Sequence, residues 1–295
     1  MLCSFAFLRR CIRFDADDFY KNEKDGESMN LLFIGDIVGK GGRRAVKELV
    51  PDIKREYNCS FCIANAENTA GGGGINAKCI KDIFPDFVDV ITLGDHVWDQ
   101  KEFENEINNF PNVVRPANLS KKQPGKGYGI YRNPGGGELA VVNLQGKVFM
   151  RESAYCPFET VDEILKTIPP NIKTVIVDFH AEATSEKAAM AHYLDGKVTA
   201  VLGTHTHVQT ADAKILPGNT AFISDVGMVG AEYSVLGREV KSVINKFVTG
   251  MPKRLPVYEK DIRLDAVILS YSYETGKAIS IKNISVHNVG NNSLN

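Results

Sequence analysis

The sequence predicts an α/β layered fold, and two patterns lead to this prediction. From Met29 onward, short apolar runs alternate with segments whose apolar residues recur at helical spacing. Most of the apolar runs also end in an acid, an amide or a histidine. Strands that alternate with helices form sheets covered by helices, and such sheets bind ligands beyond the carboxyl ends of their strands. We therefore expect a single domain over residues 29–295, with a polar site at one edge of its sheet.

The first half of this domain is expected to hold three strands, at residues 30–37, 60–68 and 89–99. The first, NLLFIGDI, is apolar enough to be buried and should break at Gly35. A helix is expected over residues 43–57, because its apolar residues recur every three to four positions. Pro51 should kink this helix or begin its second half, since proline lacks the amide hydrogen that a helix interior uses.

The second half is expected to hold four further strands, at residues 138–146, 174–182, 198–207 and 220–228. Residues 263–286 alternate between apolar and polar types and predict a hairpin that turns at residues 274–276. Between the two halves, residues 110–137 are rich in Pro, Gly and Asn. That composition predicts a loop, placed as a rim over the site.

The composition excludes several classes of protein. Of 295 residues, 43% are hydrophobic and 24% are charged, which is enough to bury a core. The net charge of -1 leaves no global basic field for a nucleic-acid backbone, so we expect no stable nucleic-acid complex. No apolar run approaches the roughly 18 residues of a membrane helix, so no membrane partner is expected. Homo-oligomer formation is left open.

The cysteines and the first 28 residues bear on where the protein works. Six cysteines are too few for a disulfide scaffold in a chain of this length, which suggests a reducing, cytoplasmic location. Cys59 and Cys62 form one CxxC, but no second pair follows at zinc-site spacing, so buried structural thiols are expected. Residues 1–28 place arginines after a short apolar stretch and then acids, unlike a secretory or transit peptide. We interpret them as an N-terminal extension that is unstructured or stems from a mis-assigned start.

Metal-capable side chains gather at the ends of five predicted strands. They are Asp36, Glu67, Asn68, Asp95, His96, His180, His205 and His207. Any one of them alone would be interpreted as a cap, a turn residue or a core histidine. The pair His205 and His207 is stronger evidence, because residues two apart in an extended segment face the same way. Five strand ends of this kind are hard to explain by capping and predict a metal centre.

The ligand types indicate which metals would bind. Zn, Mn and Fe accept mixed imidazole and carboxylate ligands, whereas Mg and Ca prefer oxygen alone, so three histidines favour a transition metal. The number of ligands favours two ions, which Glu67 can bridge. Paired ions activate a water and clamp the oxygens of a phosphoryl group during its transfer. A metal-dependent hydrolase of amides or carboxylic esters would use the same ligands and is a further interpretation.

Seven segments resemble the YmdB-like branch of the calcineurin-like metallophosphoesterases, in order from Met29 to about Pro256: GDIVGKGGR, IANAENTAGGGGI, TLGDHVWD, RPANL, VDFHAEATSEK, GTHTHVQTAD and SDVGM. The resemblance implies a four-layer α/β/β/α sandwich and two divalent or mixed-valence transition metal ions, often Fe or Mn. It also implies a small phosphodiester or nucleotide substrate, with phosphodiesterase activity on cyclic nucleotides such as 2',3'-cyclic AMP.

The resemblance also assigns roles by position. Asp36 and His207 would hold the first ion with Asn68 nearby, and Glu67 would bridge the two ions. The second ion would be held by Asp95, His180 and His205. His96 would be the catalytic general acid or charge stabiliser beside the leaving oxygen.

Two positions depart from the pattern of the superfamily. Val38 stands where the first motif often has a histidine, but the same branch generally lacks that histidine and Asn68 would compensate. Asp95 stands where the family usually has asparagine, and a further carboxylate should tighten metal binding while reducing the Lewis acidity felt by the substrate. Asp95 therefore supports an alternative function, a metal-binding regulatory protein with weak or vestigial esterase activity.

Three further segments have more than one interpretation. Gly71 to Gly74 form either a flexible turn or a backbone that closely approaches an anion. Gly39 to Gly42 could receive a phosphate before a helix, but they match neither a Walker loop nor GxGxxG. Tyr128, Tyr131 and Arg132 are candidates for contact with a base or a phosphate, although exposed loop aromatics more often pack locally.

Overall fold

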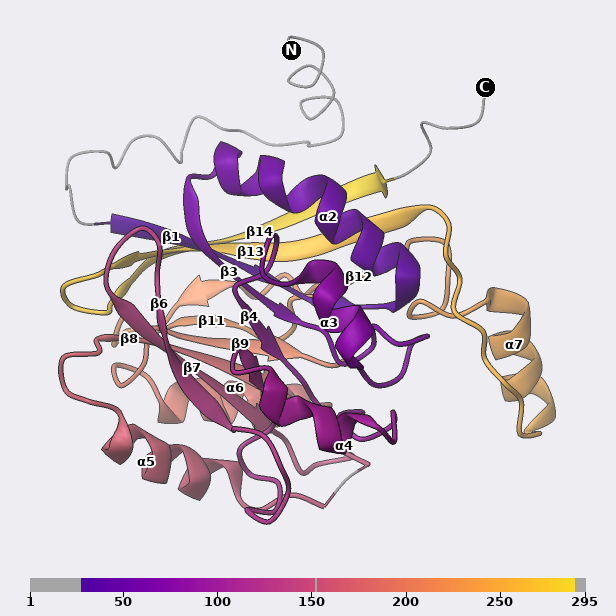
Figure 1. The fold of residues 1–295 in the computed structure, drawn as a ribbon, viewed down its shortest axis with the longest axis horizontal. Helices are drawn as coiled ribbons and strands as arrows, with labels where there is room; N and C mark the ends of the chain where they lie inside the picture. Colours follow the sequence, from indigo (N-terminus) through magenta and orange to yellow (C-terminus); the bar gives the residue numbers. More distant parts are fainter. Residues whose placement is uncertain (1–27, 152, 290–295) are drawn as a thin grey trace, which may run out of the picture.

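The computed structural model describes residues 28–151 and 153–289, and its strands form two sheets (Figure 1). The first sheet contains β1 (Ser28–Ile34), β2 (Asp36–Ile37), β3 (Cys59–Asn65), β4 (Val90–Thr92), β5 (Val113–Val114), β12 (Met228–Ala231), β13 (Ile262–Ser272) and β14 (Ala278–Val289). Its order is β2-β12-β13-β1-β3-β4-β5, and β14 pairs with β13. The N-terminal extension expected at residues 1–28 lies outside the described residues except for Ser28, which begins β1.

The second sheet contains β6 (Tyr128–Arg132), β7 (Glu138–Gln145), β8 (Thr174–His180), β9 (Ala200–Thr204), β10 (Lys214–Ile215) and β11 (Ala221–Ile223). Its order is β10-β11-β9-β8-β7-β6. The helices are α2 (Gly39–Glu56), α3 (Ala77–Ile83), α4 (Phe103–Glu106), η3 (Ile107–Asn109), α5 (Pro157–Thr167), α6 (Thr184–Tyr193) and α7 (Val240–Thr249). None of the helices within the described ranges is both long and apolar enough to cross a membrane.

Apolar cores on both faces of each sheet define four layers. One core lies between the first sheet and the helices α2 and α3, and a second joins the facing sides of the two sheets. A third lies between the second sheet and the helices α5 and α6. The layers therefore run helix, sheet, sheet, helix, as the resemblance to the YmdB-like family implied (Figure 1).

Strand β1 shows why the sequence pattern is a continuous apolar run. Leu32 and Ile34 belong to the core under α2, whereas Leu31 and Phe33 belong to the core between the sheets. The strand pairs in parallel with β3 and antiparallel with β13, so it has no free edge. A strand buried on both faces needs apolar residues at every position rather than at alternate ones.

Three expectations about local structure are wrong. Residues 220–228 do not form one strand, because Ala221–Ile223 is β11 of the second sheet and Met228 begins β12 of the first. Helix α2 begins at Gly39 rather than at Arg43, and Pro51 lies inside it. The carboxylate of Glu259 accepts hydrogen bonds from the Lys40 and Gly41 amides, so this helix start is already capped and is no phosphate site. Residues 110–137 are also not all loop, because β5 and β6 form there.

The aromatic residues of β6 make local contacts. The Tyr128 hydroxyl lies 2.8 Å from Thr167 Oγ1, and the Tyr131 hydroxyl donates to the Pro111 carbonyl at 3.2 Å. Tyr131 pairs with Leu139 near the start of β7, whereas the metal-capable residues follow the carboxyl ends of strands. Contact of these tyrosines with a substrate base is therefore not supported.

The expectation for the CxxC is confirmed. Cys59 and Cys62 are free thiols in the core beneath α2. Burial raises the pKa of Cys59 to about 12 and that of Cys62 well above its usual value. Both therefore stay protonated near neutral pH and act as small apolar core residues.

Candidate metal centre

The metal-capable residues come from both sheets and meet where the parallel strands end. Asp36 opens β2, Glu67 and Asn68 follow β3, Asp95 and His96 follow β4, His180 ends β8, and His205 and His207 follow β9. Most of these side chains are buried, and His96 is the most exposed among them, at 30%. The sequence thus predicted correctly that these distant segments come together.

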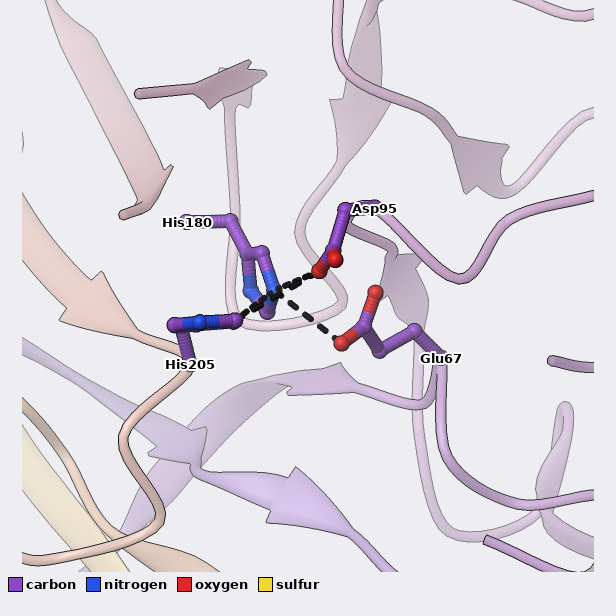
Figure 2. A group of neighbouring side chains, drawn as sticks. All are labelled: Glu67, Asp95, His180 and His205. Atoms are coloured by element: carbon purple, nitrogen blue, oxygen red, sulfur yellow. Dashed lines mark hydrogen bonds and ion pairs between the residues drawn. The ribbon is translucent and has the colours of Figure 1, made fainter. Parts of the chain in front are cut away.

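Glu67, Asp95, His180 and His205 form a first group, whose side chains point toward one another (Figure 2). His180 Nε2 lies 3.0 Å from Glu67 Oε1 and 3.3 Å from Asp95 Oδ1. His205 Nδ1 lies 3.5 Å from the same Asp95 oxygen and 3.0 Å from His180 Nε2. Four ligand atoms within 4.8 Å of one another could hold one metal ion.

Asp36, Asn68 and His207 form a second group beside the first. Asp36 Oδ1 lies 3.8 Å from His207 Nε2 and 4.0 Å from His180 Nδ1. Asn68 Nδ2 lies 3.2 Å from His207 Nε2 and donates to Glu67 Oε1 at 3.2 Å. Glu67 therefore stands between the two groups, which is the place of a bridging carboxylate.

Two glycines let the backbone come close enough to build this cluster. A Cβ on Gly35 would overlap the carbonyl group of Gly227, which accepts a hydrogen bond from the Asp36 amide at 3.0 Å. A Cβ on Gly94 would overlap the His180 ring. Any larger residue would therefore push Asp36 or Asp95, the residues that follow these glycines, out of the cluster.

The His205–Thr206–His207 turn reaches the site in a way that the sequence did not indicate. We expected the two imidazoles to face the same way from an extended segment, but β9 ends at Thr204. His205 and His207 have φ angles of 105° and 65°, which non-glycine residues rarely adopt. The turn therefore sends His205 to the first group and His207 to the second.

His96 lies beside the cluster and not inside it. Its backbone amide donates to Glu67 Oε2 at 3.1 Å, and its Nδ1 lies 2.7 Å from Asp99 Oδ2. Arg151 Nη1 donates to Asp99 Oδ1 at 3.1 Å and lies 3.5 Å from His96 Nδ1. Glu67 and Asp95 raise the pKa of His96 although its burial opposes this, so the ring favours its protonated form.

A second layer of polar side chains holds the His180 and His205 rings. The Thr204 hydroxyl donates to buried Asp178 at 2.7 Å and therefore accepts a hydrogen bond from His180 Nδ1, which is 2.9 Å away. This contact keeps Nδ1 protonated and directs Nε2 to Glu67 and Asp95. On the other ring, His205 Nε2 lies 3.1 Å from the Glu182 carboxylate.

Sequence reasoning missed these supporting residues. Asp178, Glu182 and Thr204 lie within predicted strands and next to predicted ligands, but their types are common at such positions. Their hydrogen-bond partners come from other segments of the chain, so the sequence alone carries no signal for them. Asp99 also supports a site residue, His96, and could have been found from the sequence. It follows His96 by three residues, a spacing that suits a contact within a turn.

The Gly71–Gly74 segment forms a turn, one of its two expected interpretations. The Ala70 amide donates to the Gly74 carbonyl at 2.9 Å, and the Gly72 amide donates to the Asn68 carbonyl at 3.1 Å. Arg238 donates to the carbonyls of Gly71 and Gly72. The turn fixes the backbone that follows Asn68.

The electrostatics of the cluster are those of a site built for cations. Burial raises the pKa of Asp36 to about 7, and the neighbouring Glu67 adds to this effect. Glu67 and Asp95 raise the pKa of His180 well above its usual value despite the burial of the ring. The cluster thus concentrates negative charge that must be compensated by protons or by bound cations.

The residues fit the metal ions that the sequence implies. Asp36 Oδ1 is fully buried and finds no hydrogen-bond partner within the described residues. Burial lowers the pKa of His207 to about 4, so this ring is neutral near pH 7, and neutral imidazole is the form that binds metals. An unpartnered carboxylate oxygen facing a neutral imidazole is a suitable pair of ligands for a cation.

Comparison with known proteins agrees with the fold and the cluster. The family model described as YmdB-like protein matches residues 32–284. The 2',3'-cyclic-nucleotide 2'-phosphodiesterase of Bacillus subtilis is 44% identical over 88% of this chain and 97% of its own length. The crystal structure of a novel phosphatase from Mycoplasma pneumoniae superposes with a TM-score of 0.83 at 33% identity, covering 88% of this chain and 94% of that chain.

A more distant structure defines the class of fold. The calcineurin-like phosphoesterase YfkN from Bacillus subtilis has a TM-score of 0.50 at 15% identity, covering 90% of this chain and 92% of that chain. The chain therefore has the fold of a calcineurin-like phosphoesterase, and its 44% identity to a phosphodiesterase identifies it as a hydrolase. Among proteins of this fold, the chain belongs to the YmdB-like family.

Proposed function

We propose that this protein is a phosphodiesterase with a dinuclear transition metal centre, and that its substrates are small phosphodiesters, in particular cyclic nucleotides such as 2',3'-cyclic AMP. The observation that carries the proposal is the position of Glu67 between two groups of ligand-type side chains, one of which holds the unpartnered Asp36 oxygen. The name of the Bacillus subtilis relative supports the substrate class. A cytoplasmic location remains a prediction from the sequence.

The ligand sets follow from the two groups. Asp36, Asn68 and His207 would hold one ion, whereas Asp95, His180 and His205 would hold the other, with Glu67 shared. The mixed oxygen and nitrogen donors favour Fe or Mn over Mg or Ca. Such a pair of ions, when bound, supplies an activated water and offsets the charge of the phosphoryl oxygens.

His96 would serve as the general acid. Asp99 accepts a hydrogen bond from its Nδ1, so the proton available to a leaving oxygen is the one on Nε2. Glu67 and Asp95 raise the pKa of His96, which favours the doubly protonated ring that this role requires. The hydrogen bond from the His96 backbone amide to Glu67 Oε2 fixes the backbone of His96 relative to the bridging position.

The test compares three classes of substrate on one preparation. Protein loaded with Mn²⁺ is assayed against bis-p-nitrophenyl phosphate, 2',3'-cyclic AMP and a panel of amides and carboxylic esters. The proposal is supported if the wild-type protein turns over both phosphodiesters and the His180→Ala variant turns over neither. Turnover restricted to amides or esters would replace it with a different hydrolase, and metal binding without any turnover would favour the regulatory role that Asp95 suggested.

A further inference from the structure

A buried ion pair lies behind the candidate metal centre and contacts none of its proposed ligands directly. Lys187, on α6, places its Nζ 2.8 Å from Oδ2 of Asp225, which lies between β11 and β12. The two side chains are 2% and 1% exposed. Charged residues are almost never this buried without a partner, and an apolar pair of similar volume would often be equally stable. General stability therefore does not explain why this pair is charged.

The contacts of Asp225 with the backbone indicate a more specific role. Its Oδ2 accepts a hydrogen bond from the Thr206 amide at 2.9 Å, and its Oδ1 accepts one from the Gly227 amide at 2.9 Å. Thr206 is the residue between the two histidines of the turn. Lys187 and the Thr206 amide thus share one carboxylate oxygen, which links helix α6 to the His205–Thr206–His207 turn.

This turn needs external support because its backbone is strained. The positive φ angles of His205 and His207 are unfavourable for residues with a side chain and persist only where surrounding contacts impose them. The His205 amide is held by Asp36 Oδ2 at 3.0 Å, and the His207 carbonyl accepts from Arg263 at 3.3 Å. The bond between Thr206 and Asp225 completes this support at the middle residue.

We propose that the Lys187–Asp225 pair positions the His205–Thr206–His207 turn, so that one imidazole reaches each half of the metal centre. Asp225 supplies the acceptor for the Thr206 amide, and Lys187 offsets the charge that this acceptor brings into the protein interior. The inference rests on the proposed metal centre, but its first readout does not require metal.

The test uses three variants and a matched control. Asp225→Ala removes the acceptor, Asp225→Asn keeps an oxygen at the same place, and Lys187→Met removes the charge while keeping most of the volume. Thr220→Val is the control, because Thr220 is equally buried and its hydroxyl bonds the Val198 carbonyl at 2.7 Å, at the opposite end of β9. Hydrogen exchange of residues 204–208 is measured on chelator-treated protein, and Mn²⁺ affinity is measured by chelator competition.

We expect faster exchange of residues 204–208 in Asp225→Ala and Lys187→Met, with Mn²⁺ bound about tenfold to a hundredfold more weakly, the usual effect of losing an outer support. In Asp225→Asn, the exchange rate and the Mn²⁺ affinity should lie between those of Asp225→Ala and the wild type. Thr220→Val should leave both quantities at the wild-type level. If Asp225→Ala does not fold, Lys187→Met and Asp225→Asn decide the question by the same measurements. The proposal would be overturned if the Lys187 and Asp225 variants showed the same hydrogen exchange and the same Mn²⁺ affinity as Thr220→Val.

The same measurements separate this proposal from the proposed function. A wild-type protein that binds no Mn²⁺ would overturn the metal centre. The exchange of residues 204–208 in metal-free protein would still show whether the ion pair holds the turn. A fast-exchanging turn in the variants together with normal Mn²⁺ affinity would mean that the pair shapes the turn without positioning ligands, and would also overturn the inference.

Discussion

At the scale of single residues, Asp95 is the feature that sets this chain apart from the pattern expected for its family. Together with Asp36 and Glu67 it gives the cluster three carboxylates, all buried. Although burial opposes it, hydrogen bonds with His180 and His205 hold the pKa of Asp95 well below its usual value. Asp95 is therefore a carboxylate across the whole working pH range, and its negative charge is a fixed property of the site.

Replacing Asp95 with asparagine should change metal retention and activity in opposite directions. Asp95→Asn removes one negative charge, so we expect the proposed ions to be lost more readily to a chelator. The site also becomes more positive toward an anionic phosphodiester, so kcat/KM should rise, because electrostatic stabilisation of developing charge is usually the largest catalytic contribution. Both quantities are measured on fully metallated protein with bis-p-nitrophenyl phosphate. Lower activity at full occupancy would show that the charge argument is wrong.

His96 should affect turnover without affecting metal. Its side chain contacts Asp99 and Arg151 rather than the ligand groups, so His96→Ala should leave metal content at the wild-type level. Loss of general acid assistance should lower kcat by about 10² to 10⁴. Elemental analysis and steady-state kinetics check the two parts, and His205→Ala, which should lose metal, is the comparison. Metal loss in His96→Ala but not in His205→Ala would reverse the assigned roles.

At the scale of elements, the sequence predicted the long buried strands well, and the short strands and irregular segments poorly. The apolar runs of β1, β3, β4, β8 and β9 were visible because these strands are buried on both faces. The strand β6 was missed because its side chains are only partly buried and its sequence contains Gly129. The start of α2 was missed because glycines are poor helix formers, yet Glu259, distant in sequence, caps this end.

The candidate site could be predicted for a related reason. Its residues directly follow buried strands, so the strand pattern placed them at one edge of each sheet. The strand pattern alone does not divide these residues into two groups. Only the resemblance to the family implied that division, because it depends on the positive φ angles of His205 and His207. Those angles are imposed by contacts with Asp36, Asp225 and Arg263, which no local pattern encodes.

Pro51 offers a test at the scale of one helix. It lies inside α2 on an exposed face, where it removes one backbone hydrogen bond. Pro51→Ala should therefore raise the free energy of unfolding, by up to about 3 kcal/mol, the difference between the two residues in a helix interior. Denaturant unfolding of metal-free protein measures this, with exposed Glu48→Ala on the same helix as control. An unchanged or lower value in Pro51→Ala would show that the proline is needed for packing.

At the scale of the whole molecule, the candidate site joins the two sheets. Asp36, Glu67 and Asp95 come from the first sheet, whereas His180, His205 and His207 come from the second. A cation bound between these side chains would therefore connect the two halves of the sandwich. It would also compensate the buried carboxylates that otherwise oppose close packing of the site.

Removing metal should consequently lower thermal stability. A ligand that binds only the folded state at about 100 times its Kd adds roughly 2.7 kcal/mol, which for a domain of this size corresponds to about 5–10 °C in Tm. We expect EDTA to lower the Tm of the wild-type protein by about this amount. Glu67→Gln, which lacks the bridging carboxylate, should show little further change with EDTA. Equal Tm values with and without chelator in the wild type would argue against a stabilising metal centre.

The position of β13 has a consequence for how each molecule is made. Strand β1 lies between β3 and β13, and Asp36 lies in β2, which is joined to the sheet through β12 and then β13. While the ribosome is still synthesising the chain, one edge of β1 remains unpaired until Ile262–Ser272 has emerged. The growing polypeptide thus carries an open, apolar strand edge for most of its synthesis, the kind of surface that chaperones shield. Asp36 can then take its final place beside β12 only after the chain has been synthesised through β13.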